Sequence, residues 1–341
     1  MSKHALVVNG GISRGAFAVG VVKKIFESRP ELEFDILVGT GTGSLIMPFV
    51  ALGEIEPLVE IFTTKHNKDI IRKFALSERI REASILDASP FWGLLDHYYT
   101  HGRYDRLLHT SKELYFNTVC LQTQELTVFS NKINPAVANR YAHRTIDNYD
   151  QFLRTLLASS CQPVLLPPIT IQPGEEPIRQ YIDGGDREYA GIEIAIASGA
   201  TDIYTVLLSP GAVETDNREY KDLFSILQKT LDIFIGGETD NDHIPPRLYN
   251  EGLRYIEAVK QKMRSRGIPE TSIADWFDAG MAGNPYHNRQ PVRLHIIRPD
   301  LPLGGGPDGL NFDPAIMQQM LASGEEKIGK YFAGGMIMDE R

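Results

Sequence analysis

The 341-residue sequence has only two cysteines, no long apolar run and no excess of positive charge. Cys120 and Cys161 are too few for a disulfide framework and lack metal-site spacing, so we expect both to be small buried residues. No run approaches the roughly 18 apolar residues of a membrane-spanning helix. Because a predicted strand follows the first four residues directly, no signal peptide is expected and the cytoplasm is the predicted location.

Positive charge is the scarcer sign, since 35 Lys and Arg residues stand against 44 Asp and Glu residues, a net charge of −9. This balance argues against a nucleic-acid partner and against strong general attraction to anionic lipid. Contact with a membrane, as a peripheral protein, would therefore have to be local and apolar.

Predicted strands and helices alternate from the start of the chain, which is typical of an α/β fold. ALVV precedes the amphipathic GAFAVGVVKKIFES, and FDILV precedes GSLIMPFVAL. Such βαβ units build a mostly parallel sheet with helices on both faces. Residues 54–110 are predicted to be helical and to cap one edge of the sheet. The length suits one domain over residues 1–341.

The later elements are less regular. LYFNTVCLQ and ELTVFS predict a hairpin, and residues 148–160 predict a helix. PIRQYIDGG is expected to be a strand that ends in a glycine turn, with another helix and strand in IEIAIASGATDIYTVLLSP. We expect residues 211–288 to be mostly helical, VRLHIIRP to be a strand, and LPLGGGPDGLNFDP to be a loop before a final helix.

Three glycine-bearing turns each follow a predicted strand: NGGISRG, VGTGTG and YIDGG. The helix after the first turn would begin near Arg14 and present free backbone N–H groups, which suit an oxyanion or a phosphate. Loops at the carboxyl ends of parallel strands bind ligands. The three turns could therefore converge on one site, although each alone could be merely structural.

The second turn has the spacing of a G-x-S-x-G nucleophile elbow, with Gly41 in place of the serine. An elbow needs small residues on both sides of its tip, and Gly39 and Gly43 meet that need. The turn does not fit a dinucleotide fingerprint and lacks the GK[ST] of a phosphate-binding P-loop. The elbow is thus the best geometric fit.

Taken together and in this order, the three turns resemble those of the patatin-like phospholipases, a family of serine acyl hydrolases. GAFAVGVV, ASSCQPVLLPP and AIASGATDIYTVLLSP match as well, so the resemblance covers about residues 5–210, and residues 211–341 form an extension without a match. It implies a three-layer fold with a helical cap. The implied reaction is hydrolysis of a carboxylic ester of a phospholipid or related acyl lipid, without metal or organic cofactor.

The resemblance also implies roles for individual residues. The family uses a Ser-Asp dyad, so Asp183, followed by Gly184 and Gly185, would be the base, and Gly41 marks the position of the nucleophile. The elbow residues beside it are Gly39, Thr40, Thr42 and Gly43. Backbone N–H groups of the first turn would stabilise the oxyanion. This turn contains Gly10, Gly11, Ile12, Ser13, Arg14 and Gly15.

Histidine has no place in this dyad, and we expect His243, His287 and His295 to be surface or packing residues.

Three departures from the family pattern stand out. Gly41 has no side chain, so we predict negligible ester hydrolysis, and we do not expect Ser44, Thr40 or Thr42 to substitute. Ile12 stands where the family usually has glycine, although a β-branched residue is disfavoured at positive φ. Gly191 lies near a position where the family tends to have proline.

Several explanations of Gly41 stay open: deliberate inactivation of an active enzyme, natural loss in a pseudoenzyme that still binds lipids, acyl chains or a protein, or other chemistry in a remodelled pocket. A phosphate- or nucleotide-binding module and a protein-interaction scaffold are rivals of another class. Apolar residues of the predicted cap either line an acyl channel or pack in the core. These residues are Phe91, Trp92, Leu94 and Leu95.

Overall fold

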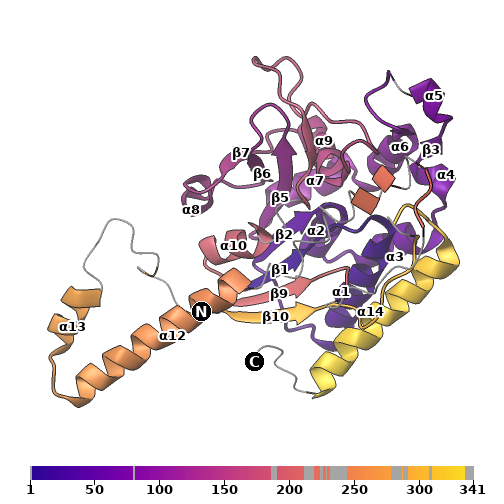
Figure 1. Ribbon diagram of the computed structural model, residues 1–341. Helices are drawn as coiled ribbons and strands as arrows, with labels where there is room; N and C mark the ends of the chain where they lie inside the picture. Colours follow the sequence, from indigo (N-terminus) through magenta and orange to yellow (C-terminus); the bar gives the residue numbers. More distant parts are fainter. Residues whose placement is uncertain are drawn as a thin grey trace.

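A computed structural model describes residues 2–79, 81–185, 190–210, 219–222, 226–227, 229–230, 244–277, 286, 291–306 and 309–334. Its main sheet has the strand order β10-β9-β1-β2-β5-β6-β7, with β8 beside β5 (Figure 1). The strands are β1 His4–Val8, β2 Ile36–Thr40, β5 Glu113–Cys120, β6 Leu126–Ser130, β7 Ala142–Thr145, β8 Tyr181–Asp183, β9 Asp202–Val206 and β10 Arg293–Ile297.

Most strand pairs in this sheet are parallel, as the βαβ pattern predicts. Strands β10, β9, β1, β2 and β5 run in one direction, while β6 and β8 run antiparallel to β5. The predicted hairpin is thus confirmed as β5–β6. Strand β2 covers residues 36–40 instead of the expected 34–38, because its ladder with β5 continues through Thr40.

Helices cover both faces of the sheet, which confirms the α/β fold. One core cluster lies between the sheet and α1, α2, α3, α9 and α14, and a second lies between the other face and α8 and α10. The helices are η1 Ile12–Arg14, α1 Gly15–Ser28, α2 Thr42–Leu52, α3 Ile55–Thr64, α4 Asn67–Ile70, α5 Leu76–Arg79, α6 Ser89–Tyr98, α7 His101–Leu108, α8 Pro135–Ala138, α9 Tyr149–Ser160, α10 Ala190–Ala197, α12 Ile244–Ser265, α13 Glu270–Phe277 and α14 Pro314–Gly334. Among them, none has the length and apolar character of a bilayer-crossing segment.

The segment 54–110 is helical for most of its length, but a small antiparallel sheet interrupts it. Strand β3, Arg72–Lys73, pairs with β4, Leu86–Asp87. Arg79 stabilises the connection because its guanidinium donates hydrogen bonds to the carbonyls of Ser84 and Leu86. The expectation of helix was wrong for these two strands, since apolar spacing does not reveal such side-chain bonds to the backbone.

The chain beyond residue 210 is tied to the sheet by β10 and α14, both of which were predicted. Helix α14 packs closely along α1 (Figure 1). Gly20 of α1 faces the backbone of Leu321, and Gly324 of α14 faces the backbone of Phe17, so closely that a Cβ at either glycine would overlap a carbonyl oxygen. Helices α12 and α13 confirm helix in part of 211–288; His243 and His287 lie outside the described residues.

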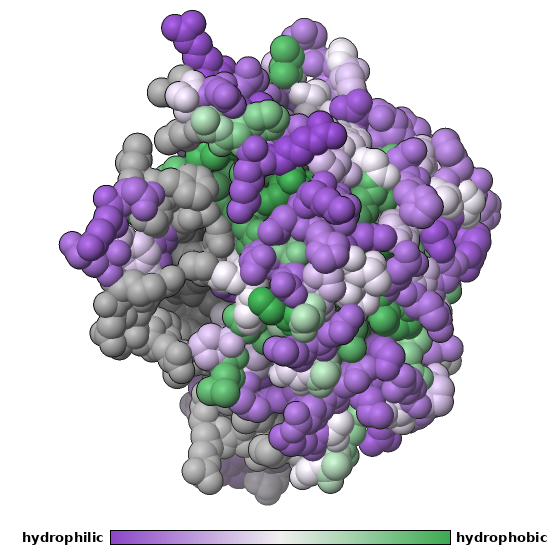
Figure 2. Space-filling view, turned by 90° about the vertical axis from the view of Figure 1, so that its right-hand side faces the viewer, coloured by the Kyte–Doolittle hydropathy of each residue, from purple (hydrophilic) through white to green (hydrophobic). Residues whose placement is uncertain are grey.

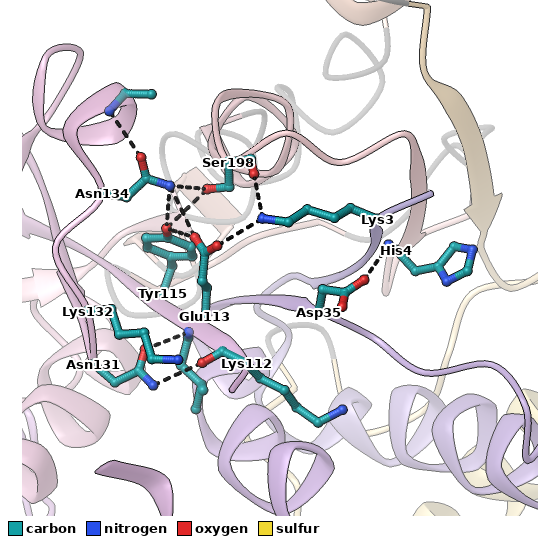
Figure 3. Close-up of polar contacts among 12 residues, drawn as sticks. Lys3, His4, Asp35, Lys112, Glu113, Tyr115, Asn131, Lys132, Asn134 and Ser198 are labelled. Atoms are coloured by element: carbon teal, nitrogen blue, oxygen red, sulfur yellow. Dashed lines mark hydrogen bonds and ion pairs between the residues drawn. The ribbon is translucent and has the colours of Figure 1, made fainter. Parts of the chain in front are cut away.

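A partly buried polar network joins the N-terminal residues to β5, at the end of the sheet opposite the glycine turns (Figure 3). Glu113 accepts hydrogen bonds from Tyr115 at 2.6 Å and Asn134 at 3.1 Å and pairs with Lys3 at 3.2 Å. Burial alone would raise the pKa of Glu113, but these hydrogen bonds hold it below its ordinary value. Since each member has a partner, the network is structural.

Two partly buried histidines make stability depend on pH. His143 lies 2.6 Å from Ser130 Oγ, and His295 stacks on Tyr204 with ring centroids 4.2 Å apart, confirming His295 as a packing residue. Burial lowers the pKa of both, although the Asp202 carboxylate opposes this for His295. Below the ordinary histidine pKa of about 6.5, the unfolded chain therefore binds more protons than the folded one, and stability is lost as pH falls.

We expect the melting temperature to fall as the pH is lowered from about 7.5 to about 5.5, because the unfolded chain then takes up more protons than the folded one. Scanning calorimetry of the chain and of a His143→Gln/His295→Phe variant checks this, because the variant should show a flatter dependence. His109→Gln is the control, since His109 is exposed. An equal pH dependence in the chain and the double variant would contradict the assignment.

Candidate active site

The three glycine turns meet at the carboxyl ends of β1 and β2. An ideal Cβ on Gly41 would lie 3.0 Å from Asp183 Oδ2 and 2.6 Å from Gly10 Cα. The first two turns follow parallel strands, as expected. The third turn follows a strand that runs in the opposite direction. Strand β8 is antiparallel to β5 and places Asp183 opposite Thr118. The residue before Thr118 is Asn117, which pairs with Thr40 at the end of β2.

Gly41 connects β2 to α2 in a backbone conformation that favours glycine. Its φ is 57° and its ψ is −127°, and it caps the N-terminus of α2. The turn is also crowded: a Cβ on Gly39 would lie 2.6 Å from Ser44 Cα, and one on Gly43 would overlap the Val8 carbonyl. The sharp strand-turn-helix geometry of an elbow is therefore present.

The hydroxyl groups next to Gly41 each have another partner. Ser44 Oγ donates to the Gly41 carbonyl at 2.6 Å and is buried. Thr42 Oγ1 donates to the Ile12 carbonyl at 3.1 Å, and Thr40 Oγ1 accepts from Asn117 Nδ2 at 2.9 Å. These hydrogen bonds use the three hydroxyl groups to stabilise the turn.

The first turn lies directly over Gly41, with Ile12 at a φ of 55°. A β-branched residue is strained in this region. The N–H of Ser13 donates to the Gly309 carbonyl at 3.2 Å, and the N–H of Arg14 donates to the Gly11 carbonyl at 3.0 Å. Within the described residues, the N–H groups of Gly10, Gly11 and Ile12 have no acceptor, so they remain available to a ligand.

A loop from the C-terminal part of the chain holds this turn in place. In addition to the Gly309 contact, Arg14 Nη2 donates to the Gly306 carbonyl at 3.0 Å. A Cβ on Gly309 would lie 2.8 Å from the Gly11 carbonyl. The sequence predicts only a loop for this stretch, and its clustered glycines are the one signal of the close backbone approach.

A cavity of about 60 Å³ adjoins the turns. Its wall is mostly apolar and comes from the cap, α2, the chain after α9 and the C-terminal part. Phe91 and Leu94 contribute to the wall; Leu95 is buried in the core, and Trp92 stacks under Arg154 at 5.6 Å. The lining residues are Ile12, Thr42, Leu45, Ile61, Phe62, Ile70, Ile71, Phe91, Leu94, Tyr99, Ser160, Gln162, Leu165, Leu166, Asp183, Leu310, Phe312 and Met317.

Few polar groups reach this cavity. Asp183 Oδ1 accepts the Gly185 N–H at 2.9 Å, while Oδ2 is the oxygen nearer to residue 41. Gln162 is 6% exposed, and its Oε1 has no hydrogen-bond partner in the described part of the chain. Gln162 lies in the ASSCQPVLLPP stretch, but no motif in the sequence predicts a role for its side chain.

Both cysteines are buried, as predicted. Burial raises the pKa of the Cys161 thiol, and the nearby Asp183 carboxylate raises it further. Cys161 is therefore protonated and unsuited to be a nucleophile. Gly191 lies in α10, where a Cβ would be 2.7 Å from Val7 of β1.

No curated protein sequence matches the chain significantly. Among solved structures, the crystal structure of VipD from Legionella pneumophila matches with 11% sequence identity and a TM-score of 0.38, covering 98% of this chain and 67% of VipD. Residues 6–196, more than half of the sequence, match the family model described as patatin-like phospholipase. The chain therefore belongs to the patatin-like phospholipase family.

Proposed function

We propose that this chain is a patatin-like protein that binds a neutral acyl ester and has lost the ability to hydrolyse it. The position of Asp183 Oδ2, 3.0 Å from an ideal Cβ on residue 41, carries the proposal. A serine hydroxyl at residue 41 would lie within hydrogen-bond reach of this carboxylate. Gly41 supplies no such oxygen, so no acyl-enzyme forms.

The remaining parts of the site suit the parent reaction. A serine hydroxyl would attack the ester carbonyl while Asp183 takes its proton, and the alcohol would leave with that proton. The N–H groups of Gly10, Gly11 and Ile12 would stabilise the negative oxygen of the tetrahedral intermediate. Water would then release the acid from the acyl-enzyme by the same route.

The wall of the cavity favours the apolar carbons next to an ester group over a phosphate group. Its wall is mostly Ile, Leu and Phe side chains, and Asp183 places a carboxylate on it. A phosphate there would meet like charge, and Arg14 is engaged with the Gly306 carbonyl. The same repulsion disfavours a free fatty acid, so a neutral ester is the preferred ligand.

Ligand binding is tested by thermal stabilisation with a monoacylglycerol kept below its micelle concentration. At roughly 100 times its Kd, the ligand should add about 2.7 kcal/mol to the free energy of unfolding. Inorganic phosphate should add nothing. Leu94→Ser should remove much of the ester effect, whereas Leu108→Ser is the matched control because Leu108 is 42% exposed and outside the cavity wall. Equal stabilisation by phosphate would favour the rival anion-binding module.

The inactive state has its own test, the turnover of a p-nitrophenyl acyl ester. The unmodified chain should not exceed the buffer rate. Turnover that disappears in Asp183→Asn would show that the chain hydrolyses esters without a serine at residue 41, and the proposal of lost hydrolysis would be wrong.

A further inference from the structure

Apolar patches reach the surface between hydrophilic residues on the side of the molecule shown in Figure 2. Two exposed apolar side chains lie next to the small sheet β3–β4 in the sequence or through backbone hydrogen bonds. Phe74, directly after β3, is 47% exposed, and Val164 is 46% exposed. The carbonyl of Val164 accepts a hydrogen bond from the Ile85 N–H at 3.0 Å. The carbonyl of Leu165, the next residue, accepts one from the Leu86 N–H at the same distance. Phe74 and Val164 therefore belong to one structural unit, which we call the β3–β4 face.

This face is basic although the chain is acidic. Residues 65–87, which include both strands of the small sheet, contain six Lys and Arg residues and four Asp and Glu residues, a local charge of +2 against −9 for the whole chain. The basic residues are Lys65, Lys68, Arg72, Lys73, Arg79 and Arg81. Arg79 lies 5.5 Å from the centre of the Phe74 ring.

Several of these charges are open to a partner. Lys68, Lys73 and Arg81 are exposed and have no acidic partner within the described ranges, and Arg72 approaches Asp87 only to 3.9 Å. Exposed cations beside exposed apolar side chains match the two components of an anionic bilayer surface, its headgroups and its acyl region.

The inner side of the same unit is part of the cavity wall. Ile70 and Ile71 precede Arg72, and Leu165 and Leu166 follow Val164; all four line the cavity. A lipid surface against the β3–β4 face would thus lie next to the cavity that we propose to hold an acyl chain.

We propose that the β3–β4 face docks on an anionic lipid bilayer, with Phe74 and Val164 in the interfacial region and Lys68, Lys73 and Arg81 against the headgroups. The proposal deepens the proposed function by naming the source of the ligand, and it needs no turnover. Because the net charge of the chain opposes binding, attraction depends on these local cations.

Vesicle co-sedimentation at low ionic strength tests the proposal, using phosphatidylcholine vesicles with and without about one third phosphatidylserine. We expect binding to the anionic vesicles only, weakened by salt. Lys73→Glu/Arg81→Glu should lower the partition coefficient by roughly tenfold or more, and Phe74→Ser should lower it by roughly tenfold. Lys262→Glu and Ile133→Ser, at exposed positions on α12 and after β6, are the controls and should bind like the unmodified chain.

Insertion is measured with Phe74→Trp and vesicles containing brominated phosphatidylcholine, which quench a tryptophan that enters the acyl region. Quenching above that of the unmodified chain is the expected result. Equal binding to neutral and anionic vesicles, no binding at low salt, or adsorption without this quenching would each overturn the proposal, as would preference for an acidic protein over anionic vesicles. Monoacylglycerol stabilisation in solution is measured separately, so a failure of docking and a failure of ligand binding are distinguishable.

Discussion

Gly41→Ser combined with Ile12→Gly is expected to hydrolyse a p-nitrophenyl acyl ester, and the unmodified chain is expected not to. The serine would place a hydroxyl beside Asp183 and below the available N–H groups of Gly10 and Gly11. Since removing a nucleophile typically lowers the rate of a serine hydrolase by several powers of ten, we expect a gain of roughly a thousandfold or more over the unmodified chain.

Gly41→Ser alone should gain less, because the first turn lies too close. A Cβ at residue 41 would lie 2.6 Å from Gly10 Cα, so Gly10 must move. Movement is resisted by Ile12, because its backbone is already strained at a φ of 55°. Glycine at residue 12 adopts this conformation without strain and lets the turn adjust.

Gly41→Ala/Ile12→Gly is the matched control, because it introduces the same Cβ without the hydroxyl. It should fold like the serine variant and remain inactive, as should Gly41→Ser/Ile12→Gly/Asp183→Asn. Activity in the alanine variant would show that the hydrolysis comes from another group. A folded but inactive serine variant would refute the assignment of Asp183 as base.

Gly20→Ala is expected to lower the free energy of unfolding by about 2–3 kcal/mol or more. Its Cβ would overlap the Leu321 carbonyl of α14, and backbone cannot yield as a flexible side chain can, so α1 and α14 must separate and lose apolar contact. Chemical denaturation monitored by circular dichroism measures the change.

Gly329→Ala in α14 is the control, since nothing lies within 4 Å of its added Cβ. This change should stabilise the protein by about 0.5–1 kcal/mol through helix propensity. Equal destabilisation by both substitutions would contradict the packing argument, because it would attribute the loss to helix α14 in general and not to the contact at Gly20.

The order of strands and helices and the place of the elbow could be predicted because both depend on short-range patterns. Buried strands alternate with amphipathic helices, and small residues flank residue 41. The small sheet β3–β4 and the antiparallel entry of β8 depend instead on contacts between distant segments, such as Asp183 opposite Thr118. Spacing of apolar residues does not encode these contacts.

The contribution of the C-terminal part was missed for the same reason. The loop around Gly309 carries no catalytic motif, and its contacts with Ser13 and Arg14 are made through its backbone carbonyls. Because these contacts are made by the backbone, glycine is the only sign of them in the sequence. Likewise, the apolar pattern of α6 showed that it is buried but not which residues reach a cavity; Phe91 and Leu94 do, whereas Leu95 does not.

The bond from the Ser13 N–H to the Gly309 carbonyl bears on where this protein can be divided. The family match ends at residue 196, yet a fragment cut there would lose Gly309, the cavity residues Leu310, Phe312 and Met317, and the helix that covers α1. Its first glycine turn would have no outer support, and the apolar surface of α1 would face water. The smallest piece that keeps the candidate site intact therefore extends from the first glycine turn to α14, and an expression boundary drawn from the family match would remove part of that site.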